Sequence, residues 1–420
     1  MRKELKNKII IILVVVLVSG CAGPTERQPE VIQPIWTKIF DRTTSLDFAN
    51  QTVDGGYITI SNIESLQPST EGSYQSYAWL IKTDINGNEQ WNKTFGGPRD
   101  RNVGNSVEQT SDGGYIIAGY TYTGSIYRTS DDAWLIKTDK NGNVQWNKTF
   151  GGIGPDRIYY AKQTSDEGYI AVGDTYSNYD PKYASIHPLY SLSEKGNGAW
   201  LIKTDKNGNE QWNKTFGGIY ATDRGEDCAR TVQQTLDGGY IIGGSKLFPT
   251  GEPPSSCPSC GFQSYAWLIK TDVDGNEQWN KTFGEENNDV STDYVQQMPD
   301  EGYITIASQD TWIIKTDKNG NVQWNRTFGG FANSAQRTSD GGYIIAGSGA
   351  ESQVRNRIIK TDSNGNIIWN KMLKGPDQTD ANSIRQVYDG GYIIAGTTIF
   401  YGVEPESFNR RALLLKISLS

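Results

Sequence analysis

The chain repeats one sequence pattern seven times. Each copy reads roughly Gln-Thr-Ser-Asp-Gly-Gly-Tyr-Ile-Ile-Ala-Gly and, after a stretch of variable length, Ala-Trp-Leu-Ile-Lys-Thr-Asp-Lys-Asn-Gly-Asn-Val-Gln-Trp-Asn-Lys-Thr-Phe-Gly-Gly. The tyrosine of the first half marks the copies, called repeats 1 to 7: Tyr57, Tyr115, Tyr169, Tyr240, Tyr303, Tyr343 and Tyr392. Their spacing runs from 40 residues (Tyr303 to Tyr343) to 71 (Tyr169 to Tyr240). Such periods in a β-rich chain are typical of propeller blades.

Each copy predicts four short strands, a to d. In repeat 2 they are expected over 107–110, 115–119, 133–138 and 144–150. An Asp-Gly-Gly turn separates a from b and an Asn-Gly turn separates c from d, and both are hairpin signals. The second glycine of the a–b turn occurs in every copy, whereas Glu167 and Glu301 replace the first. We therefore expect the second glycine to have a positive φ.

The strands with which the pattern starts and stops predict how the two ends of the chain pair. Residues 35–40 read as a strand d without its blade, and residues 413–417 read as a strand c without its d. Pairing them would leave no free edge between the first and last blades. We expect an all-β fold: one seven-bladed β-propeller of four-stranded antiparallel blades over residues 35–420, closed by that pairing.

All twelve tryptophans lie in two strands of the pattern. Seven occupy strand d and five occupy strand c. Large aromatic residues that recur at one register favour packing between blades over a ligand platform.

The first 34 residues differ from the rest. Four basic residues precede ten apolar ones (9–18), and Ser19-Gly20-Cys21 follows. This resembles the lipobox of prokaryotic lipoproteins, which implies a signal peptide over 1–20, cleavage before Cys21 and a lipid on its sulfur. The proline-containing segment 21–34 reads as an extended tether. A membrane-spanning helix is the weaker alternative, because ten apolar residues are too short to cross a bilayer.

This leader places the protein at the cell membrane, lipid-anchored on the extracytoplasmic face. Without residues 1–20 the chain has 36 basic and 47 acidic residues, a balance of −11. Such an acidic chain is a poor candidate for nucleic-acid binding. We expect a monomer.

Three cysteines remain: Cys228, Cys257 and Cys260. Outside the cytoplasm a disulfide is the favoured interpretation, although which two would pair stays open. A structural zinc site would need a fourth ligand, and the only histidine, His187, lies in another repeat. Free thiols are the third alternative, and no metal is expected.

Two polar motifs have structural and functional interpretations. Asp-Arg pairs precede strand a at Asp41, Asp100, Asp156 and Asp223. A ring of them could bind anions, but ion pairs between blades and turn caps are the simpler interpretation. The aspartates of the c–d turns superficially resemble calcium loops, yet a tight hairpin supplies too few oxygens, so capped turns are favoured.

The longest insertions fall in b–c loops, which should gather on one face. Loops on a rigid scaffold are frequent binding sites. The candidate ligand face is formed by aromatic residues of repeats 3 and 4: Tyr176, Tyr179, Tyr183, Tyr190, Phe248 and Phe262.

Six Asn-x-Thr sequons are candidate glycosylation sites: Asn50, Asn92, Asn147, Asn213, Asn280 and Asn325. All except Asn50 lie on strand d, the outermost strand, next to an inward tryptophan and so facing solvent. A repeat that merely copies an unused sequon is an equal alternative.

The Asp-x-x-Gly-x-x-x-Trp stretch (Asp139, Gly142, Trp146) resembles propellers with tryptophan-docking motifs, broadly the quinoprotein-like class. The Asp-Gly-Gly-Tyr-Ile-Ile-Ala-Gly and Trp-Leu-Ile-Lys-Thr-Asp segments are similar to repeats of uncharacterised prokaryotic surface lipoproteins and secreted proteins, many of them archaeal. The chain lacks the adjacent cysteine pair and the calcium carboxylates of quinoprotein dehydrogenases, so the resemblance implies no quinone and we expect no cofactor.

Two functional hypotheses remain, and no catalytic residue is assigned. The favoured one is a non-catalytic binding or scaffold module for a protein or glycan of the cell envelope. The alternative is a polysaccharide hydrolase or lyase using loop carboxylates such as Asp174, Asp180 and Glu194. A hydrolase needs two carboxylates about 5 to 10 Å apart.

Overall fold

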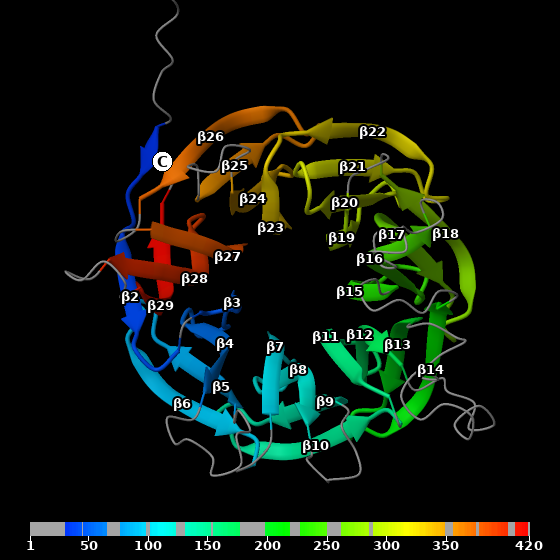
Figure 1. The fold of residues 1–420 in the computed structure, drawn as a ribbon, viewed down its shortest axis with the longest axis horizontal. Helices are drawn as coiled ribbons and strands as arrows, with labels where there is room; N and C mark the ends of the chain where they lie inside the picture. The colour runs from blue at the N-terminus through cyan, green and yellow to red at the C-terminus, as the bar shows by residue number, and fades with distance from the viewer. Residues whose placement is uncertain are drawn as a thin grey trace, which may run out of the picture.

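A computed structural model describes residues 30–418 except 44, 65–75, 98–100, 123–130, 153, 177–197, 219–226, 250–261, 285–288, 349–355, 375–377 and 402–407. The predicted leader, Cys21 and most of the predicted tether lie outside these residues. All regular secondary structure in the described part is β-strand. Figure 1 shows the sheets arranged around a central axis.

The strands follow the repeats. Two strands precede repeat 1: β1 (Val31–Ile32) and β2 (Trp36–Phe40). Repeats 1 and 2 form β3 (Phe48–Gln51), β4 (Tyr57–Glu64), β5 (Ser76–Thr83), β6 (Glu89–Phe95), β7 (Arg101–Gln109), β8 (Tyr115–Tyr122), β9 (Asp131–Thr138) and β10 (Val144–Phe150). Repeats 3 and 4 form β11 (Asp156–Gln163), β12 (Tyr169–Thr175), β13 (Gly198–Thr204), β14 (Glu210–Gly217), β15 (Cys228–Gln234), β16 (Tyr240–Pro249), β17 (Phe262–Thr271) and β18 (Glu277–Phe283).

The later repeats continue in the same order. Repeats 5 and 6 form β19 (Thr292–Gln297), β20 (Tyr303–Ala307), β21 (Trp312–Thr316), β22 (Val322–Thr327), β23 (Phe331–Arg337), β24 (Tyr343–Ser348), β25 (Arg357–Thr361) and β26 (Ile367–Leu373). Repeat 7 forms β27 (Gln378–Gln386), β28 (Tyr392–Tyr401) and β29 (Phe408–Ile417).

Within each repeat, consecutive strands pair antiparallel, with strand a innermost and strand d outermost (Figure 1). A parallel bridge between Ser76 and Arg101 joins repeats 1 and 2 into one sheet. The fourth strand of repeat 7 is β2, which pairs antiparallel with β29 from Trp36↔Lys416 to Phe40↔Ala412. The short β1 lies parallel to β26 at the outer edge of repeat 6, so residues 31–32 of the predicted tether are paired with the sheet.

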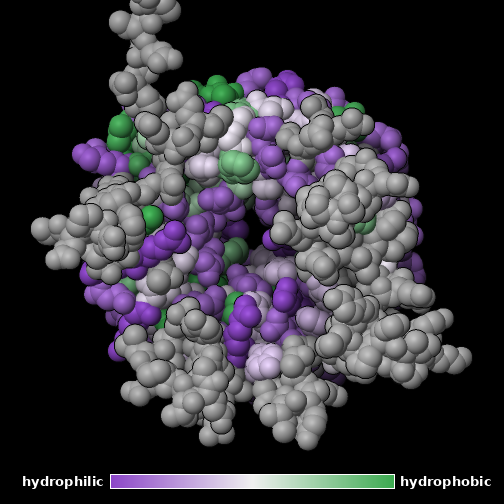
Figure 2. Space-filling model, viewed as in Figure 1, coloured by the Kyte–Doolittle hydropathy of each residue, from purple (hydrophilic) through white to green (hydrophobic). Residues whose placement is uncertain are grey.

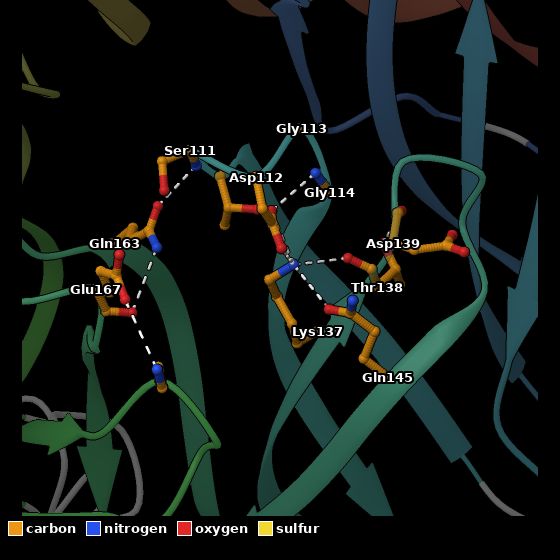
Figure 3. A network of polar contacts seen from close by, with 12 residues as sticks. Ser111, Asp112, Gly113, Gly114, Lys137, Thr138, Asp139, Gln145, Gln163 and Glu167 are labelled. Carbon is orange, nitrogen blue, oxygen red and sulfur yellow. Dashed lines mark hydrogen bonds and ion pairs between the residues drawn. The ribbon is translucent and has the colours of Figure 1, made fainter.

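A buried lysine near the end of strand c connects that strand to the a–b turn of each repeat. In repeat 2, Lys137 Nζ lies 2.9 Å from Asp112 Oδ2 of the a–b turn, 2.8 Å from the Thr138 carbonyl oxygen and 3.0 Å from Gln145 Oε1 of strand d (Figure 3). The Lys137 side chain is only 4% exposed. A buried ammonium must be paired and hydrogen-bonded to be tolerated, so this contact ties the a–b turn to strand c.

The same lysine–aspartate pair occurs in every repeat. The pairs are Lys82–Asp54, Lys137–Asp112, Lys203–Asp166, Lys270–Asp237, Lys315–Asp300, Lys360–Asp340 and Lys416–Asp389.

The prediction for the second turn glycine was wrong in its physical reason. The first position of the pair has the positive φ, for example 81° at Gly113, and Glu167 and Glu301 adopt 67° and 63° there. The second glycine is required by space instead. A Cβ added at Gly114 would lie 2.1 Å from the Thr138 carbonyl oxygen and 2.6 Å from Lys137 Nζ.

Tryptophans of strand d pack onto the following repeat, as the pattern predicts. The Trp91 ring of repeat 1 lies 5.9 Å from the Tyr115 ring of repeat 2, measured between centroids. It also covers the c–d turn, where a Cβ added at Gly142 would lie 2.8 Å from the Trp91 ring. Corresponding ring pairs join Trp36 to Tyr57, Trp146 to Tyr169, Trp212 to Tyr240 and Trp279 to Tyr303.

The c–d turns are capped by their aspartates. Asp139 Oδ1 accepts the N–H groups of Asn141 and Asn143, both at 2.8 Å, and Asp139 Oδ2 accepts the Asn143 amide. These hydrogen bonds hold the pKa of the Asp139 carboxyl below its ordinary value. Five other turns repeat this geometry, which confirms the capped-turn interpretation.

Candidate functional site: the central channel

The described aromatic residues of the predicted ligand face lie at the ends of strands. The Tyr176 N–H donates to the Pro155 carbonyl oxygen just after β12. Phe248 and Phe262 belong to the extended hairpin of β16 and β17, and the Phe248 ring meets Tyr265 edge-on at 5.4 Å. Tyr179, Tyr183 and Tyr190 lie outside the described residues.

Cys228 opens β15 and is a buried free thiol, with its Sγ 3.1 Å from Ser245 Oγ. Burial raises the pKa of the Cys228 thiol. Cys228 is unpaired, contrary to the pairings that would include it. Cys257 and Cys260 lie outside the described residues, so a disulfide between these two remains a prediction.

The strand d sequon asparagines lie on the outer surface, as expected from their register. Asn147, Asn213, Asn280 and Asn325 are exposed, and Asn92 is half-buried. In repeat 1, Asn92 Oδ1 accepts the Trp79 indole N–H at 3.1 Å and Asn92 Nδ2 donates to Glu89. Asn50 differs, because it lies on innermost strand a and its Nδ2 faces the Val107 carbonyl oxygen at 3.4 Å.

The described Asp-Arg motifs act as caps and ion pairs. Asp156 is fully buried, and its Oδ2 accepts the Gly152 N–H at 2.9 Å. Arg157 of repeat 3 pairs with Asp131 of repeat 2 at 2.9 Å. Its guanidinium also lies 5.4 Å from the Tyr120 ring centroid.

The innermost strands enclose a central cavity of about 500 Å³. Figure 2 shows this hollow at the middle of the molecule, with mostly hydrophilic residues on its visible wall. Strand a of every repeat contributes to the lining. The cavity falls within the size range of small-molecule sites, about 300 to 1,000 Å³.

A β-bulge in strand a directs one extra side chain into this channel. The pairing register skips one residue in each of repeats 2 to 7: Asn105, Tyr159, Arg230, Asp293, Asn333 and Asn382. In repeat 1, Asp47 stands at the same place just before β3. Bulges re-aim side chains and are frequent beside functional sites.

Where the bulge residue is asparagine, it connects neighbouring repeats. Asn105 Nδ2 donates to the Ile158 carbonyl oxygen of repeat 3 at 2.7 Å, and Asn333 Nδ2 donates to the Ala381 carbonyl oxygen of repeat 7 at 2.9 Å. Asn382 reaches Ser45 of repeat 1 at 2.7 Å. Asparagine is therefore the residue that this structural role favours.

Three consecutive repeats replace that asparagine with Tyr159, Arg230 and Asp293. The Arg230 guanidinium lies 5.6 Å from the Tyr159 ring centroid, and Arg230 Nε lies 4.0 Å from Asp293 Oδ1. The Arg230 side chain is 46% exposed and that of Asp293 is 28% exposed. We call these three residues the channel triad. The Arg230 guanidinium lies between the Tyr159 ring and the Asp293 carboxylate, and it is exposed enough to donate a hydrogen bond to a further acceptor.

The residue that directly follows the bulge position also lines the channel. It is aromatic in three repeats (Phe48, Tyr160 and Tyr294) and is serine or threonine in the others. The Phe48 and Tyr160 centroids are 6.3 Å apart. The Tyr160 hydroxyl donates to Glu108 at 2.7 Å, and the Arg385 guanidinium lies 4.8 Å from the Phe48 centroid. These contacts give the middle of the channel a partly aromatic wall.

Charge in the channel is close to balance although the chain is acidic. The lining contains Asp47, Glu108 and Asp293 against Lys162, Arg230, Arg337 and Arg385. Burial raises the pKa of Asp293 to about 6, against the opposing effect of Arg230. Burial also raises the pKa of Asp47. Protonation of either carboxyl makes the channel more positive.

Two buried serine hydroxyls on the wall, Ser106 Oγ and Ser383 Oγ, have no hydrogen-bond partner among the described residues. Buried hydroxyls are normally satisfied, so a local rearrangement or a bound water would be needed to give these two a partner.

Of the carboxylates named for the enzyme hypothesis, Asp174 is fully buried and acts electrostatically on Arg157. Asp180 and Glu194 lie outside the described residues. No group of three potential metal ligands occurs in the described part of the chain. Nor does any described segment form a helix long and apolar enough to cross a membrane.

The channel triad is not among the site residues predicted from the sequence. A signal was present, because aligning the seven copies at the bulge shows asparagine in three of them and Tyr159, Arg230 and Asp293 in consecutive others.

No family model and no curated protein matches the chain. Among solved structures, streptogramin B lyase aligns over 91% of this chain and 98% of its own, with 9% identity and a TM-score of 0.50. The C-terminal WD40 domain of Sif2 covers 93% and 99% with 10% identity and a TM-score of 0.46. A protein of unknown function from Dyadobacter fermentans covers 92% and 99% with 10% identity and a TM-score of 0.48. At these identities the likeness concerns the fold alone, which is an all-β fold of the propeller type.

Proposed function

We propose that this chain is a lipid-anchored, extracytoplasmic binding module whose central channel takes up part of a protein or glycan of the cell envelope, without catalysis. In this proposal the seven repeats are the seven blades of a closed ring. The pairing of β2 with β29 supports the closure. So do the hydrogen bonds from the Leu46 N–H to the Gly396 carbonyl oxygen and from the Ala412 N–H to the Thr43 carbonyl oxygen.

The channel triad carries the binding proposal. Asparagine at the bulge donates a hydrogen bond to the next repeat. Its replacement in three consecutive repeats therefore removes these hydrogen bonds on one side of the channel. What replaces it is a ring, a half-exposed guanidinium and a carboxylate. Arginine and tyrosine are residues that favour recognition, because they combine large contact area with directed hydrogen bonds. The polar wall of the channel suits a hydroxyl-rich or amide-rich ligand.

A binding screen of the mature protein against envelope glycans and surface proteins tests this proposal. The matched control carries Tyr159→Asn, Arg230→Asn and Asp293→Asn together, which installs the residue that repeats 2, 6 and 7 already have at the bulge. This variant should fold, because it extends an existing contact. Ligands retained by the wild type should be lost by the variant, and equal retention would exclude the triad from binding.

The alternative function, a polysaccharide hydrolase or lyase, has one supporting observation. Asp293 has a pKa raised to about 6 by burial and lies beside Arg230, a combination that suits proton transfer. Under this alternative Asp293→Asn should abolish the cleavage of a polysaccharide that the wild type cleaves. Binding of an intact polysaccharide, with no new reducing or unsaturated ends, would favour the binding module.

A further inference from the structure

Besides the hydrogen bonds of the bulge asparagines, a second kind of hydrogen bond joins neighbouring repeats. It lies at the other end of strand a, next to the a–b turns. A glutamine that ends strand a accepts the backbone N–H of the first turn residue in the preceding repeat. The distances are 2.9 Å for Gln109–Val53, 2.8 Å for Gln163–Ser111, 2.9 Å for Gln234–Ser165, 2.8 Å for Gln297–Leu236, 2.7 Å for Gln386–Ser339 and 2.7 Å for Gln51–Tyr388. We call this contact the glutamine latch.

At one boundary, between repeats 5 and 6, both partners of the latch are changed. Arg337 stands where the glutamine would be, and Pro299 stands where the N–H donor would be. Proline has no N–H to give, and the arginine side chain has no acceptor to receive one. Because the donor and the acceptor are both missing, the latch is absent at this boundary and neither of its two groups is left unpaired.

A second cavity, of about 460 Å³, extends along the turn face from the turns of repeats 3 and 4 to Pro299 and Arg337 at this boundary. Its apolar wall is formed by Leu236, Met298 and Pro299, and its polar wall includes Gln297 and Arg337. Leu236 is 82% exposed, although its counterparts in repeats 2, 3 and 6 are serines. Arg337 lines this cavity and the central channel.

The Arg337 guanidinium lacks a counterion. It makes no ion pair within the described residues, and its buried Nε has no hydrogen-bond partner there. The nearby turn carboxylates are already engaged, since Asp300 pairs with Lys315 at 2.8 Å and Asp340 pairs with Lys360 at 2.9 Å. The charge of Arg337 is thus left without a carboxylate among the described residues, and the guanidinium would attract a carboxylate from outside the chain.

The buried hydroxyl of Tyr343 also lacks a partner. Burial raises the pKa of Tyr343 to about 12, and the charge of Arg337 opposes this rise. The guanidinium and the hydroxyl thus give the same region of repeat 6 two unpaired donors.

We propose that this turn-face cavity binds an acidic peptide segment of a partner protein, with a carboxylate on Arg337 and an adjacent apolar side chain against Leu236, Met298 and Pro299. Guanidinium and carboxylate groups match in charge and in paired hydrogen-bond geometry. The exposed leucine and the proline give the neighbouring side chain an apolar contact that the serine-bearing turns cannot offer. This site shares no residue with the channel triad, although Arg337 also lines the channel, and the inference does not depend on the function proposed for the triad.

The experiment is a titration of the mature, ¹⁵N-labelled protein with the blocked dipeptide acetyl-Leu-Asp-amide, followed at the Arg337 Nε–H resonance. That resonance is identified by its absence in Arg337→Gln. Acetyl-Leu-Asn-amide is the matched probe without charge, and acetyl-Gly-Asp-amide is the matched probe without the apolar side chain. We expect the Asp dipeptide to shift the resonance and to bind at least about tenfold more tightly than the Asn dipeptide, because a hydrogen bond to a charged group contributes about 1.5 to 3 kcal/mol. The Gly dipeptide should bind more weakly than the Leu dipeptide.

The double variant Pro299→Ser with Arg337→Gln is the control, because it rebuilds the glutamine latch that the other repeats use. It should fold and should not bind the Asp dipeptide. Equal binding of the Asp and Asn dipeptides would overturn the proposal, as would no shift up to about 10 mM of the Asp dipeptide. A shift by acetate as large as that by the Asp dipeptide would reduce the site to an adventitious ion only. These comparisons use the wild-type protein, so they hold even if a variant fails to fold.

Discussion

Gln51 Oε1 accepts the backbone N–H of Tyr388 at 2.7 Å, although the two residues are 337 positions apart in the chain. This contact has the same form as the glutamine latches between consecutive repeats. Repeat 7 therefore meets repeat 1 through the same contact that joins the other consecutive repeats, except repeats 5 and 6. If the contact closes a ring, then removing the strand that completes repeat 7 should destabilise the whole molecule, because each blade depends on its neighbours.

Truncation tests this dependence. Deleting residues 22–40 removes β1 and β2 and exposes the β29 edge, where residues 412–416 pair with β2. We expect a large fall in melting temperature and the appearance of oligomers, since an unpaired strand edge recruits other chains. Of the described contacts, deleting residues 22–30 removes those of Glu30 to Lys371 and the Met372 N–H, so its effect should be small. Equal melting of the two truncated proteins would show that the end pairing does not hold the ring.

The two turn glycines should respond differently to alanine. Gly114→Ala places a Cβ 2.1 Å from the Thr138 carbonyl oxygen and should destabilise strongly, by about 3 kcal/mol or more, because backbone must move. Gly113→Ala meets only Lys140 at 4.0 Å and carries the strain of φ 81°, a cost of about 1 kcal/mol. Chemical denaturation of both variants measures the difference. The order would be reversed if the positive φ of Gly113 were the dominant requirement.

Removal of the buried ammonium tests the lysine–aspartate pair. Lys137→Met keeps the apolar stem but leaves the Thr138 carbonyl oxygen and Gln145 without their donor. We expect a loss of roughly 2 kcal/mol, below the cost of breaking a fully buried pair, because Asp112 is about half exposed to water. Lys140→Met, an exposed position in the neighbouring turn, is the control and should change stability little. Equal melting temperatures for the two variants would contradict a stabilising role for the buried pair.

How far the sequence predicts this structure depends on the kind of contact. Strands b, c and d show apolar runs and hairpin turns, so the packing of Trp91 on Tyr115 could be predicted from register. Strand a could not be delimited in the same way. In repeat 2 we expected it over 107–110, whereas β7 runs from Arg101 to Gln109. The bulge at Asn105 interrupts the alternation of side chains, and alternation is what a single sequence displays.

The functional candidates were missed for the same reason. Arg230 and Asp293 are bulge residues with paired residues on either side of them, and the bulge turns them toward the channel. The glutamine latch depends on a backbone N–H, which leaves no trace in side-chain chemistry. Its absence at Arg337 and Pro299 becomes visible only when the copies are compared in the folded register.

Titration of Asp293 should make stability fall as pH rises from about 4 to about 6. Burial raises its pKa from 3.8 to about 6 in the folded protein, so within this window the folded state keeps a proton that the unfolded state has lost. The facing groups are Arg230, which opposes the shift, and the hydroxyls of Ser291 and Ser308. Asp293→Asn removes this titration, so the variant should gain roughly 1 to 2 kcal/mol on the wild type between pH 4.5 and pH 7. A constant difference across that range would mean that Asp293 titrates normally.

The pH dependence of the turn aspartates has the opposite sign and provides an internal comparison. Thr110, Gly114 and Lys137 bind the Asp112 carboxylate and lower its pKa to about 2, against the opposing effect of burial. Such groups stabilise the fold above pH 4, and this stabilisation is lost as the pH falls toward 2. Asp112→Asn should therefore lose stability relative to the wild type at pH 7 but not at pH 2. Melting curves of Asp112→Asn and Asp293→Asn over pH 2 to 7 should diverge in opposite directions from the wild type.

Membrane attachment through Cys21 is the remaining prediction, and its reasoning is energetic. Burial of a lipid chain contributes about 0.8 kcal/mol per CH₂, so two or more long chains anchor a protein stably where one does not. Cys21→Ser should therefore lose the lipid mass and should leave the detergent phase for the aqueous phase, or remain attached only by an uncleaved leader. Because the described propeller begins at residue 30, the melting temperature of its folded part should stay unchanged. Incorporation of labelled lipid by the serine variant would contradict the lipoprotein assignment and would make the first 20 residues an ordinary signal or anchor.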